Sequence, residues 1–261
     1  MGSGFNEASA ITPRGDGWTA EIPADWAQGR TAFGGLSAAI TLRAVQELPG
    51  LSGLPVRSVD VAFVGPVAPG SVQVTAEVLR RGKYLTHAAA QLLGPAGEAL
   101  VRTHVVLGHR RESGVHVAPR DPEPVAMADC TEMPFIPGLV PDFVQGFDFR
   151  FATPFPFTGS SEARIDGYCR HRSVADGIPA IVALVDAWPG TVLPVLTSPA
   201  PASTVRWSMQ FPGDEPVAGQ DWFWYESRTA VAAGGYSTIV AHLWAGERLV
   251  AWSEQLLAVF D

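Results

Sequence analysis

Two segments of this chain have the composition of helices that are apolar on nearly every side. The first spans residues 32–48 and the second spans residues 178–188. Thr31 can cap the first segment, and Asp176 or Gly177 lies where a cap of the second is expected. A helix without a polar face must be surrounded by other elements, because water would otherwise contact its apolar sides. This requirement constrains the fold more than any other feature of the sequence.

The segments near the two helices alternate between apolar and polar residues and are rich in β-branched side chains. This pattern is typical of strands with one buried face. The sequence predicts strands at 57–63, 71–79, 84–93 and 99–108 after the first helix, and at 146–151, 163–170, 204–211, 222–231, 237–244 and 249–259 around the second. A buried helix with a set of antiparallel strands is an α+β unit, and the chain contains two of them.

The two units repeat one plan. Gly97-Glu-Ala-Leu-Val101 returns as Gly246-Glu-Arg-Leu-Val250 after 149 residues, and Phe63 corresponds to Phe211 after 148 residues. The same order of elements at nearly the same offset predicts a tandem duplication.

The chain is long enough for two such units. It has 261 residues, of which 47% are hydrophobic, and a chain of this length can bury a large core. Six prolines fall between residues 119 and 141, where apolar periodicity is weak. We therefore expect an N-terminal unit at residues 1–117, a proline-rich linker at 118–142 and a C-terminal unit at 143–261 that carries the catalytic residues.

Charge and cysteine content exclude several functions. The 18 basic and 26 acidic residues give a net charge of −8, Lys83 is the single lysine, and no long basic run occurs. Nucleic acids and membranes are therefore not expected as partners. Cys130, Cys169 and the six histidines lack the spacings of disulfide or metal sites, so we expect no metal and no cofactor. The first ten residues lack a signal-peptide pattern, and the longest apolar stretch has only 12 residues, so a cytoplasmic location is expected.

Four short stretches resemble a known family. They are Leu184-Val-Asp186, Pro201-Ala-Ser-Thr-Val-Arg-Trp-Ser-Met-Gln-Phe211, Tyr225-Glu-Ser227 and Leu249-Val-Ala-Trp-Ser-Glu-Gln255. Together they are similar to the acyl-CoA thioesterase II family and its thioesterase-like relatives. The resemblance covers about residues 18–260 without the linker. It implies an α+β tandem, or double, hotdog fold, in which each unit is a long buried helix wrapped by a curved antiparallel sheet.

The resemblance also implies an activity. Members of this family hydrolyse acyl-CoA thioesters with an activated water and without a covalent enzyme nucleophile. The matching positions for the three groups that hold this water are Asp186, Thr204 and Gln255, and Ser203 replaces Thr204 if the register differs by one residue. The expected substrate is a fatty acyl-CoA or a similar acyl thioester. Where relatives carry an arginine-glycine pair, this chain has Gly234-Gly235.

The residue types suit this chemistry. A carboxylate such as Asp186 in an apolar helix is costly unless it is hydrogen-bonded, and burial raises its pKa toward the range of a general base. The alternative is that Asp186 ends its helix and faces water. Thr204 can orient the attacking water or be an ordinary strand residue. Glu254 and Gln255 are neighbours on a predicted strand, so their side chains face opposite sides and one of them faces inward. Gln255 is the better candidate, because a neutral amide costs less to bury than a carboxylate.

Gly34 and Gly35 open the first helix, where backbone N–H groups and the absence of side chains suit substrate binding. Tight packing of this helix is the alternative reason for the two glycines. The duplication places Arg43 at the position of Asp186 and Val106 at the position of Gln255. We therefore expect one active site per chain, with walls from both units.

Two other functions remain open. Asp166 and His171 have the spacing of hotdog enoyl-CoA hydratases, although a straight strand would place them on opposite faces. A non-catalytic acyl-CoA binding protein with the same fold is the other possibility. The stretch from Gly35 to Ala39 resembles a degenerate serine nucleophile motif, but no strand leads into it.

Two further features concern partners. The basic clusters at residues 80–83 and 110–111 could contact the phosphates of CoA or could be solvated strand ends. Open sheet edges in each unit favour a homodimer.

Overall fold

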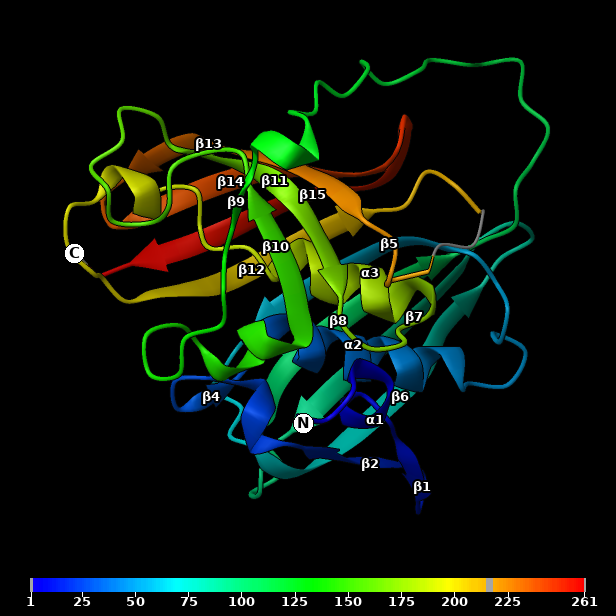
Figure 1. Ribbon diagram of the computed structural model, residues 1–261. Helices are drawn as coiled ribbons and strands as arrows, with labels where there is room; N and C mark the ends of the chain where they lie inside the picture. Colours follow the sequence, from blue (N-terminus) through cyan, green and yellow to red (C-terminus); the bar gives the residue numbers. More distant parts are fainter. Residues whose placement is uncertain (1, 215–217, 261) are drawn as a thin grey trace.

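The structure is a computed structural model that describes residues 2–214 and 218–260 (Figure 1). Its helices are α1 (Phe5–Ala8), α2 (Gly34–Gln46) and α3 (Gly177–Asp186), with short 3₁₀ helices η1 (Ala24–Trp26), η2 (Met127–Asp129), η3 (Asp142–Gly146) and η4 (Leu193–Val195). The first eight strands are β1 (Thr12–Arg14), β2 (Gly17–Ile22), β3 (Ala27–Gln28), β4 (Thr31–Ala32), β5 (Val56–Phe63), β6 (Gly70–Arg81), β7 (Thr86–Leu93) and β8 (Ala99–Leu107). The others are β9 (Thr131–Glu132), β10 (Phe147–Phe151), β11 (Arg164–His171), β12 (Ala202–Gln210), β13 (Phe223–Ala233), β14 (Tyr236–Ala245) and β15 (Arg248–Val259).

Thirteen of the described strands form one antiparallel sheet with the order β1-β2-β6-β7-β8-β5-β12-β15-β14-β13-β11-β10-β9. The order within β2-β6-β7-β8-β5 is mirrored in β11-β13-β14-β15-β12. The two halves join at β5 and β12, where Asp60 lies opposite Ser208. These two residues are 148 positions apart, the same offset as Phe63 and Phe211. An approximate twofold axis therefore passes between β5 and β12, as the tandem duplication predicts.

Helices α2 and α3 pack against each other inside the curved sheet (Figure 1). Almost every residue of both helices is buried, including the small residues Ala38, Ala39 and Ala183. This arrangement satisfies the requirement that both apolar helices be surrounded, and it confirms the predicted α+β tandem hotdog fold.

The predicted elements agree with the structure in type and approximate position, but the predicted cap of α2 is wrong. The N-cap of α2 is Phe33, and the Thr31 hydroxyl donates to the carbonyl of Gln28. Asp176 occupies the N-cap position of α3, but its side chain makes no capping hydrogen bond. The cause for α2 is that Thr31 belongs to the short β3–β4 hairpin, which ends before the helix begins.

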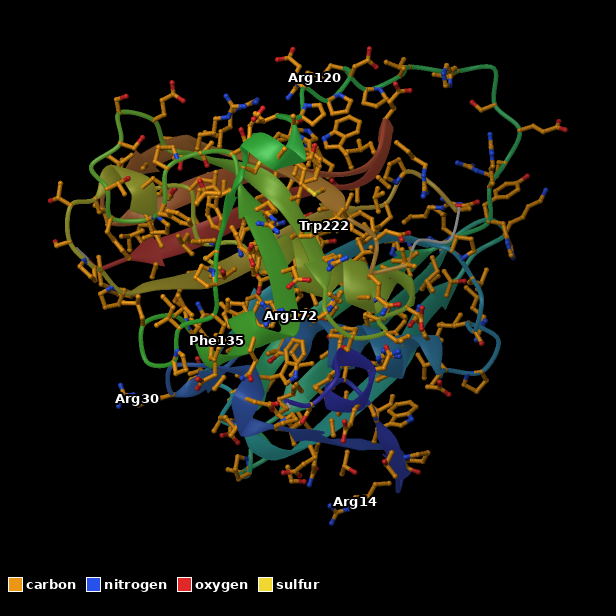
Figure 2. All side chains as sticks on the ribbon, viewed as in Figure 1. Arg14, Arg30, Arg120, Phe135, Arg172 and Trp222 are labelled. Atoms are coloured by element: carbon orange, nitrogen blue, oxygen red, sulfur yellow. The ribbon has the colours of Figure 1, made fainter. Side chains whose placement is uncertain are left out.

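The segment predicted as a linker contacts the C-terminal half of the sheet. Its strand β9 pairs with β10, and the carbonyl of Val125 accepts a hydrogen bond from the Tyr168 hydroxyl. Arg120 donates to Glu226 Oε1 at 2.7 Å, and Figure 2 shows this arginine at the top of the molecule beside the sheet. The strands β1 and β2 were not predicted, because their pattern is short and interrupted by proline and glycine. None of the described helices has the length and apolar character needed to cross a membrane.

The repeated hairpins allow a test of the duplication at the level of backbone geometry. Gly97 and Gly246 turn the chain between β7 and β8 and between β14 and β15, with φ angles of 82° and 60°. A residue with a side chain is destabilised by about 1–2 kcal/mol when its φ angle is positive in this way. We expect Gly97→Ala and Gly246→Ala each to lower the free energy of unfolding in urea by that amount. Gly114→Ala is the control, because φ is not positive there and an added Cβ meets no atom within 4 Å. Equal stabilities of all three variants would contradict the expectation.

Candidate active site

Asp186 is the last residue of α3 and lies at the beginning of α2. Its carboxylate accepts a hydrogen bond from the backbone N–H of Gly35. The first N–H groups of an α-helix have no partner within the helix, and Phe33 at the N-cap of α2 makes no side-chain capping bond. Asp186 therefore supplies, from the other half of the chain, the capping carboxylate that α2 lacks.

Gln255 connects the other two predicted site residues. Its Nε2 donates to Asp186 Oδ1 at 2.9 Å and to Thr204 Oγ1 at 2.7 Å. A carboxylate is only an acceptor, so the amide nitrogen must face Asp186. Both N–H bonds of the amide are thereby used, and the Thr204 hydroxyl proton remains free to donate elsewhere. The three side chains converge, as expected from the sequence, with Gln255 as the bridge between the other two.

A β-bulge places Thr204 in this cluster. Thr204 pairs with Leu257 and Arg206 pairs with Leu256, so Val205 is an extra residue in β12. If side chains alternated regularly along β12, Thr204 would lie on the face opposite to that of the buried Trp207. The bulge turns Thr204 toward the inner face, on which Gln255 also lies. Ser203 is exposed and pairs with Ala258, so it does not replace Thr204.

The environment of Asp186 alters its acidity. Burial raises the pKa of this carboxyl from its ordinary value of 3.8 to about 7, although hydrogen bonds from Gln255 and Gly35 favour the charged form. Asp186 is half-buried as a residue. A carboxyl group with a pKa near neutral has the acidity of a general base.

The two glycines at the beginning of α2 have different structural roles. A Cβ at Gly34 would lie 2.8 Å from Asp186 Oδ2 and 3.3 Å from the Phe63 ring, so this glycine leaves space directly in front of the carboxylate. A Cβ at Gly35 would lie 2.5 Å from the Phe33 ring and 3.0 Å from the Ala183 Cα, so Gly35 permits close packing of α2 on α3. Phe63 was not identified from the sequence as part of the site, because only the fold brings the end of β5 to this helix terminus.

The position in the N-terminal half that is equivalent to Asp186 is occupied by a basic residue. Arg43 is the tenth residue of α2, as Asp186 is of α3. The Arg43 guanidinium donates to Ser9 Oγ at 2.9 Å and to Asn6 Oδ1 at 3.0 Å, and it lies over the ring of Phe5. The N-terminal segment thus covers this position. Of these two equivalent places, only the one in the C-terminal half holds an Asp-Thr-Gln cluster among the described residues.

Asp166 and His171 do not form a pair. Asp166 accepts a hydrogen bond from the Ser227 N–H and forms an ion pair with Arg164. His171 lies in the aromatic core, where its Nε2 is 3.0 Å from the Ala180 carbonyl oxygen and burial lowers its pKa to about 4. The two residues face opposite sides of the strand, so the hydratase arrangement is absent. Ser37 is also buried and its hydroxyl donates to the Phe33 carbonyl, which excludes a nucleophile there.

Gly234-Gly235, which replaces the arginine-glycine pair of the relatives, forms the turn between β13 and β14 with positive φ at both residues. Among the residues that the structure describes, no group of three or more His, Cys, Asp and Glu side chains is arranged to hold a metal ion.

Comparisons with known proteins identify the family and the fold. Residues 22–118 match a family model described as the acyl-CoA thioesterase N-terminal domain, and residues 127–259 match the acyl-CoA thioesterase C-terminal domain. A hotdog-fold protein of unknown function from Alicyclobacillus acidocaldarius is similar in structure, with a TM-score of 0.88, 22% identity and 98% coverage of each chain. An acyl-CoA thioesterase II from Mycobacterium marinum has a TM-score of 0.78, 16% identity and 98% coverage of each chain. At these identities the two structures show a shared fold. No curated protein sequence matches the chain.

The raised pKa of Asp186 predicts how stability depends on pH. The folded protein holds the Asp186 proton up to a pH of about 7, whereas the unfolded chain releases it near 3.8. Ionisation of Asp186 therefore destabilises the fold progressively as pH rises through this window. Asp186→Asn cannot ionise, so its free energy of unfolding should exceed that of the wild type above pH 7, by at most about 4 kcal/mol at 1.36 kcal/mol per pKa unit.

Urea unfolding at several pH values between 4 and 9 measures this difference. The advantage of Asp186→Asn should shrink as pH falls toward 4, where both proteins are neutral at this position. A constant difference across the range would contradict the pKa shift. Ser203→Ala, which changes a neighbouring exposed residue, is the control and should follow the wild type.

Proposed function

The chain belongs to the acyl-CoA thioesterase family, and from this membership and the Asp186 cluster we propose that it hydrolyses an acyl-CoA to a free acid and CoA. The observation that carries the proposal is the double hydrogen bond of Gln255 Nε2 to Asp186 Oδ1 and Thr204 Oγ1. This contact joins a base, a hydroxyl donor and the amide that fixes them, at the edge of an otherwise apolar interior.

Asp186 acts as the general base. Gln255 binds Oδ1 and holds the carboxylate in one orientation, while Oδ2 faces the space left by Gly34. A water in this space donates one proton to Asp186 as its oxygen attacks the thioester carbonyl carbon. The free Thr204 hydroxyl proton can bond the water oxygen and orient it. Carbon and oxygen form a bond, and the carbonyl electron pair moves to the carbonyl oxygen.

The tetrahedral intermediate needs stabilisation of its negative oxygen. The N–H of Gly34 lies at the N-terminus of α2, where the helix has no internal acceptor for it and where the helix dipole favours negative charge. The oxyanion then returns its electron pair, the carbon–sulfur bond breaks, and the CoA thiolate takes the proton from Asp186. The products are the acid and the CoA thiol, and Asp186 is again ionised.

Variants of the three residues test the proposal. Asp186→Asn should lower kcat/KM for acyl-CoA hydrolysis by roughly 10²–10⁴-fold, because the base is lost. Thr204→Val and Gln255→Leu should each lower it by about 10²-fold, because the water or the base is no longer positioned. Release of the CoA thiol over a panel of acyl chain lengths measures the rates.

Ser203→Ala is the matched control and should retain wild-type activity, because Ser203 lies on the opposite face of β12 from Thr204. Binding of acyl-CoA by the wild type without thiol release would favour the non-catalytic alternative. Unchanged release in Asp186→Asn would contradict the proposed base.

The pH dependence of kcat/KM gives an independent measurement. The rate should rise with pH and reach half of its maximum near pH 7, where Asp186 ionises. The hydrogen bond from Gln255 lowers the pKa of Asp186, so its removal in Gln255→Leu should move the midpoint to higher pH. Ser203→Ala should keep the wild-type midpoint. A midpoint near 4 in the wild type would identify a different ionising group.

A further inference from the structure

The outer face of the sheet has a hollow beside the joint between β5 and β12. It measures about 390 Å³, and small side chains from β5 and β7, including Ala62 and Ala89, leave it open. Arg102 of β8 and Arg206 of β12 line its sides, together with Asp60 and His104. The volume lies within the range of small-molecule sites.

The two arginines flank one alanine. Ala62 pairs with Arg206 on one side and with Arg102 on the other. Paired residues of neighbouring strands share a face, so both guanidinium groups stand on the outer face with the methyl group of Ala62 between them. Two strand spacings separate their backbones by about 10 Å.

The charges at the hollow favour an anion. No ion pair or hydrogen bond to another described residue is seen for either Arg102 or Arg206. Asp60 supplies a carboxylate in the hollow, and its Oδ2 lies 3.9 Å from His104 Nδ1. The other ring nitrogen of His104, Nε2, lies 3.1 Å from His87 Nδ1. Guanidinium groups bind phosphate oxygens with two parallel hydrogen bonds, which suits a diphosphate placed between two arginines.

The hollow and the catalytic cluster are connected through β12, because Arg206 lines the hollow and Thr204 belongs to the cluster. The pairing of β5 with β12 ends at Ala62 and Arg206, and the preceding residues Thr204 and Val205 have no described partner on β5. The bulge at Val205 directs Thr204 inward and Arg206 outward. A linear substrate with its thioester at Asp186 would reach the two arginines by passing the end of this strand pairing.

We propose that Arg102 and Arg206 bind the phosphate groups of the CoA part of the substrate in this hollow. This inference rests on the proposed function, and it assigns the carrier as a phosphate-bearing thioester held on the outer face of the sheet. The basic clusters at residues 80–83 and 110–111 are less suitable. They lie at the end of β6 and just beyond the end of β8, near Val56 and a full strand length of about 20 Å from Phe63.

A comparison of two substrates tests the site. One is the acyl-CoA from the panel that the wild type hydrolyses best, and the other is the N-acetylcysteamine thioester of the same acid, which has no phosphate. In Arg102→Gln/Arg206→Gln the KM for the acyl-CoA should rise roughly tenfold or more, because charge-assisted hydrogen bonds are lost, while kcat stays within about twofold. The kinetic constants for the phosphate-free thioester should not change.

The control is Arg14→Gln/Arg110→Gln, which removes the same charge from exposed positions. Arg14 lies on β1, at the far edge of the sheet (Figure 2). This variant should keep the wild-type KM for the acyl-CoA. Calorimetric titration with free CoA gives a second measurement, in which the hollow variant should bind at least tenfold more weakly than the control and the wild type.

Three kinetic or binding results would overturn the inference. They are an unchanged KM and CoA affinity in the hollow variant, an equal change in the control variant, and an equal loss on the phosphate-free thioester. A change of oligomeric state in the hollow variant, measured by sedimentation, would also overturn it by assigning this face to a second copy of the chain. If the wild type hydrolyses neither thioester, the proposed function fails, whereas the titration with CoA still decides whether the hollow binds phosphate.

Discussion

The hydrogen bond between the Asp186 carboxylate and the N-terminus of α2 connects the two halves of the molecule at the place where chemistry is proposed. It supplies the cap that α2 lacks in its own sequence, and it holds an acidic group inside an apolar interior. These two effects oppose each other, because the helix terminus favours the charged carboxylate and burial disfavours it. Burial dominates, so the carboxyl titrates near neutral pH. The same interaction thus makes the site reactive and makes it costly to the stability of the fold.

The approximate twofold symmetry shows how one duplicated plan gives two different outcomes. At the tenth position of each helix, one half carries Asp186 and the other carries Arg43. Arg43 is satisfied by Asn6 and Ser9, and the ring of Phe5 in the same segment packs on His171 with centroids 4.6 Å apart. The N-terminal segment therefore supplies the partners of one of the two equivalent positions. At the other position, Asp186 is bound by Gln255 and by the N-terminus of α2.

The extra residue in β12 has a larger effect than its size suggests. Because successive strand residues face opposite sides, one inserted residue reverses the orientation of all that follow. Here Val205 allows Thr204 to reach Gln255 on the inner face while Arg206 stands on the outer face. The pairing of β5 and β12 ends at the same point.

The sequence by itself determined the two buried helices, the strands that surround them and the repeated plan, because apolar periodicity and hairpin glycines are local signals. Together with the family resemblance it also identified Asp186, Thr204 and Gln255, whose catalytic roles stay predictions, as do the homodimer and the cytoplasmic location. The sequence missed Phe63 and assigned the cap of α2 to the wrong residue. The tertiary structure alone decided that Asp186 caps α2, that Gln255 bridges the other two residues, and that Asp166 and His171 are apart. These outcomes depend on strand register and on contacts between distant segments, and a single inserted residue such as Val205 changes register without leaving a local signal in composition.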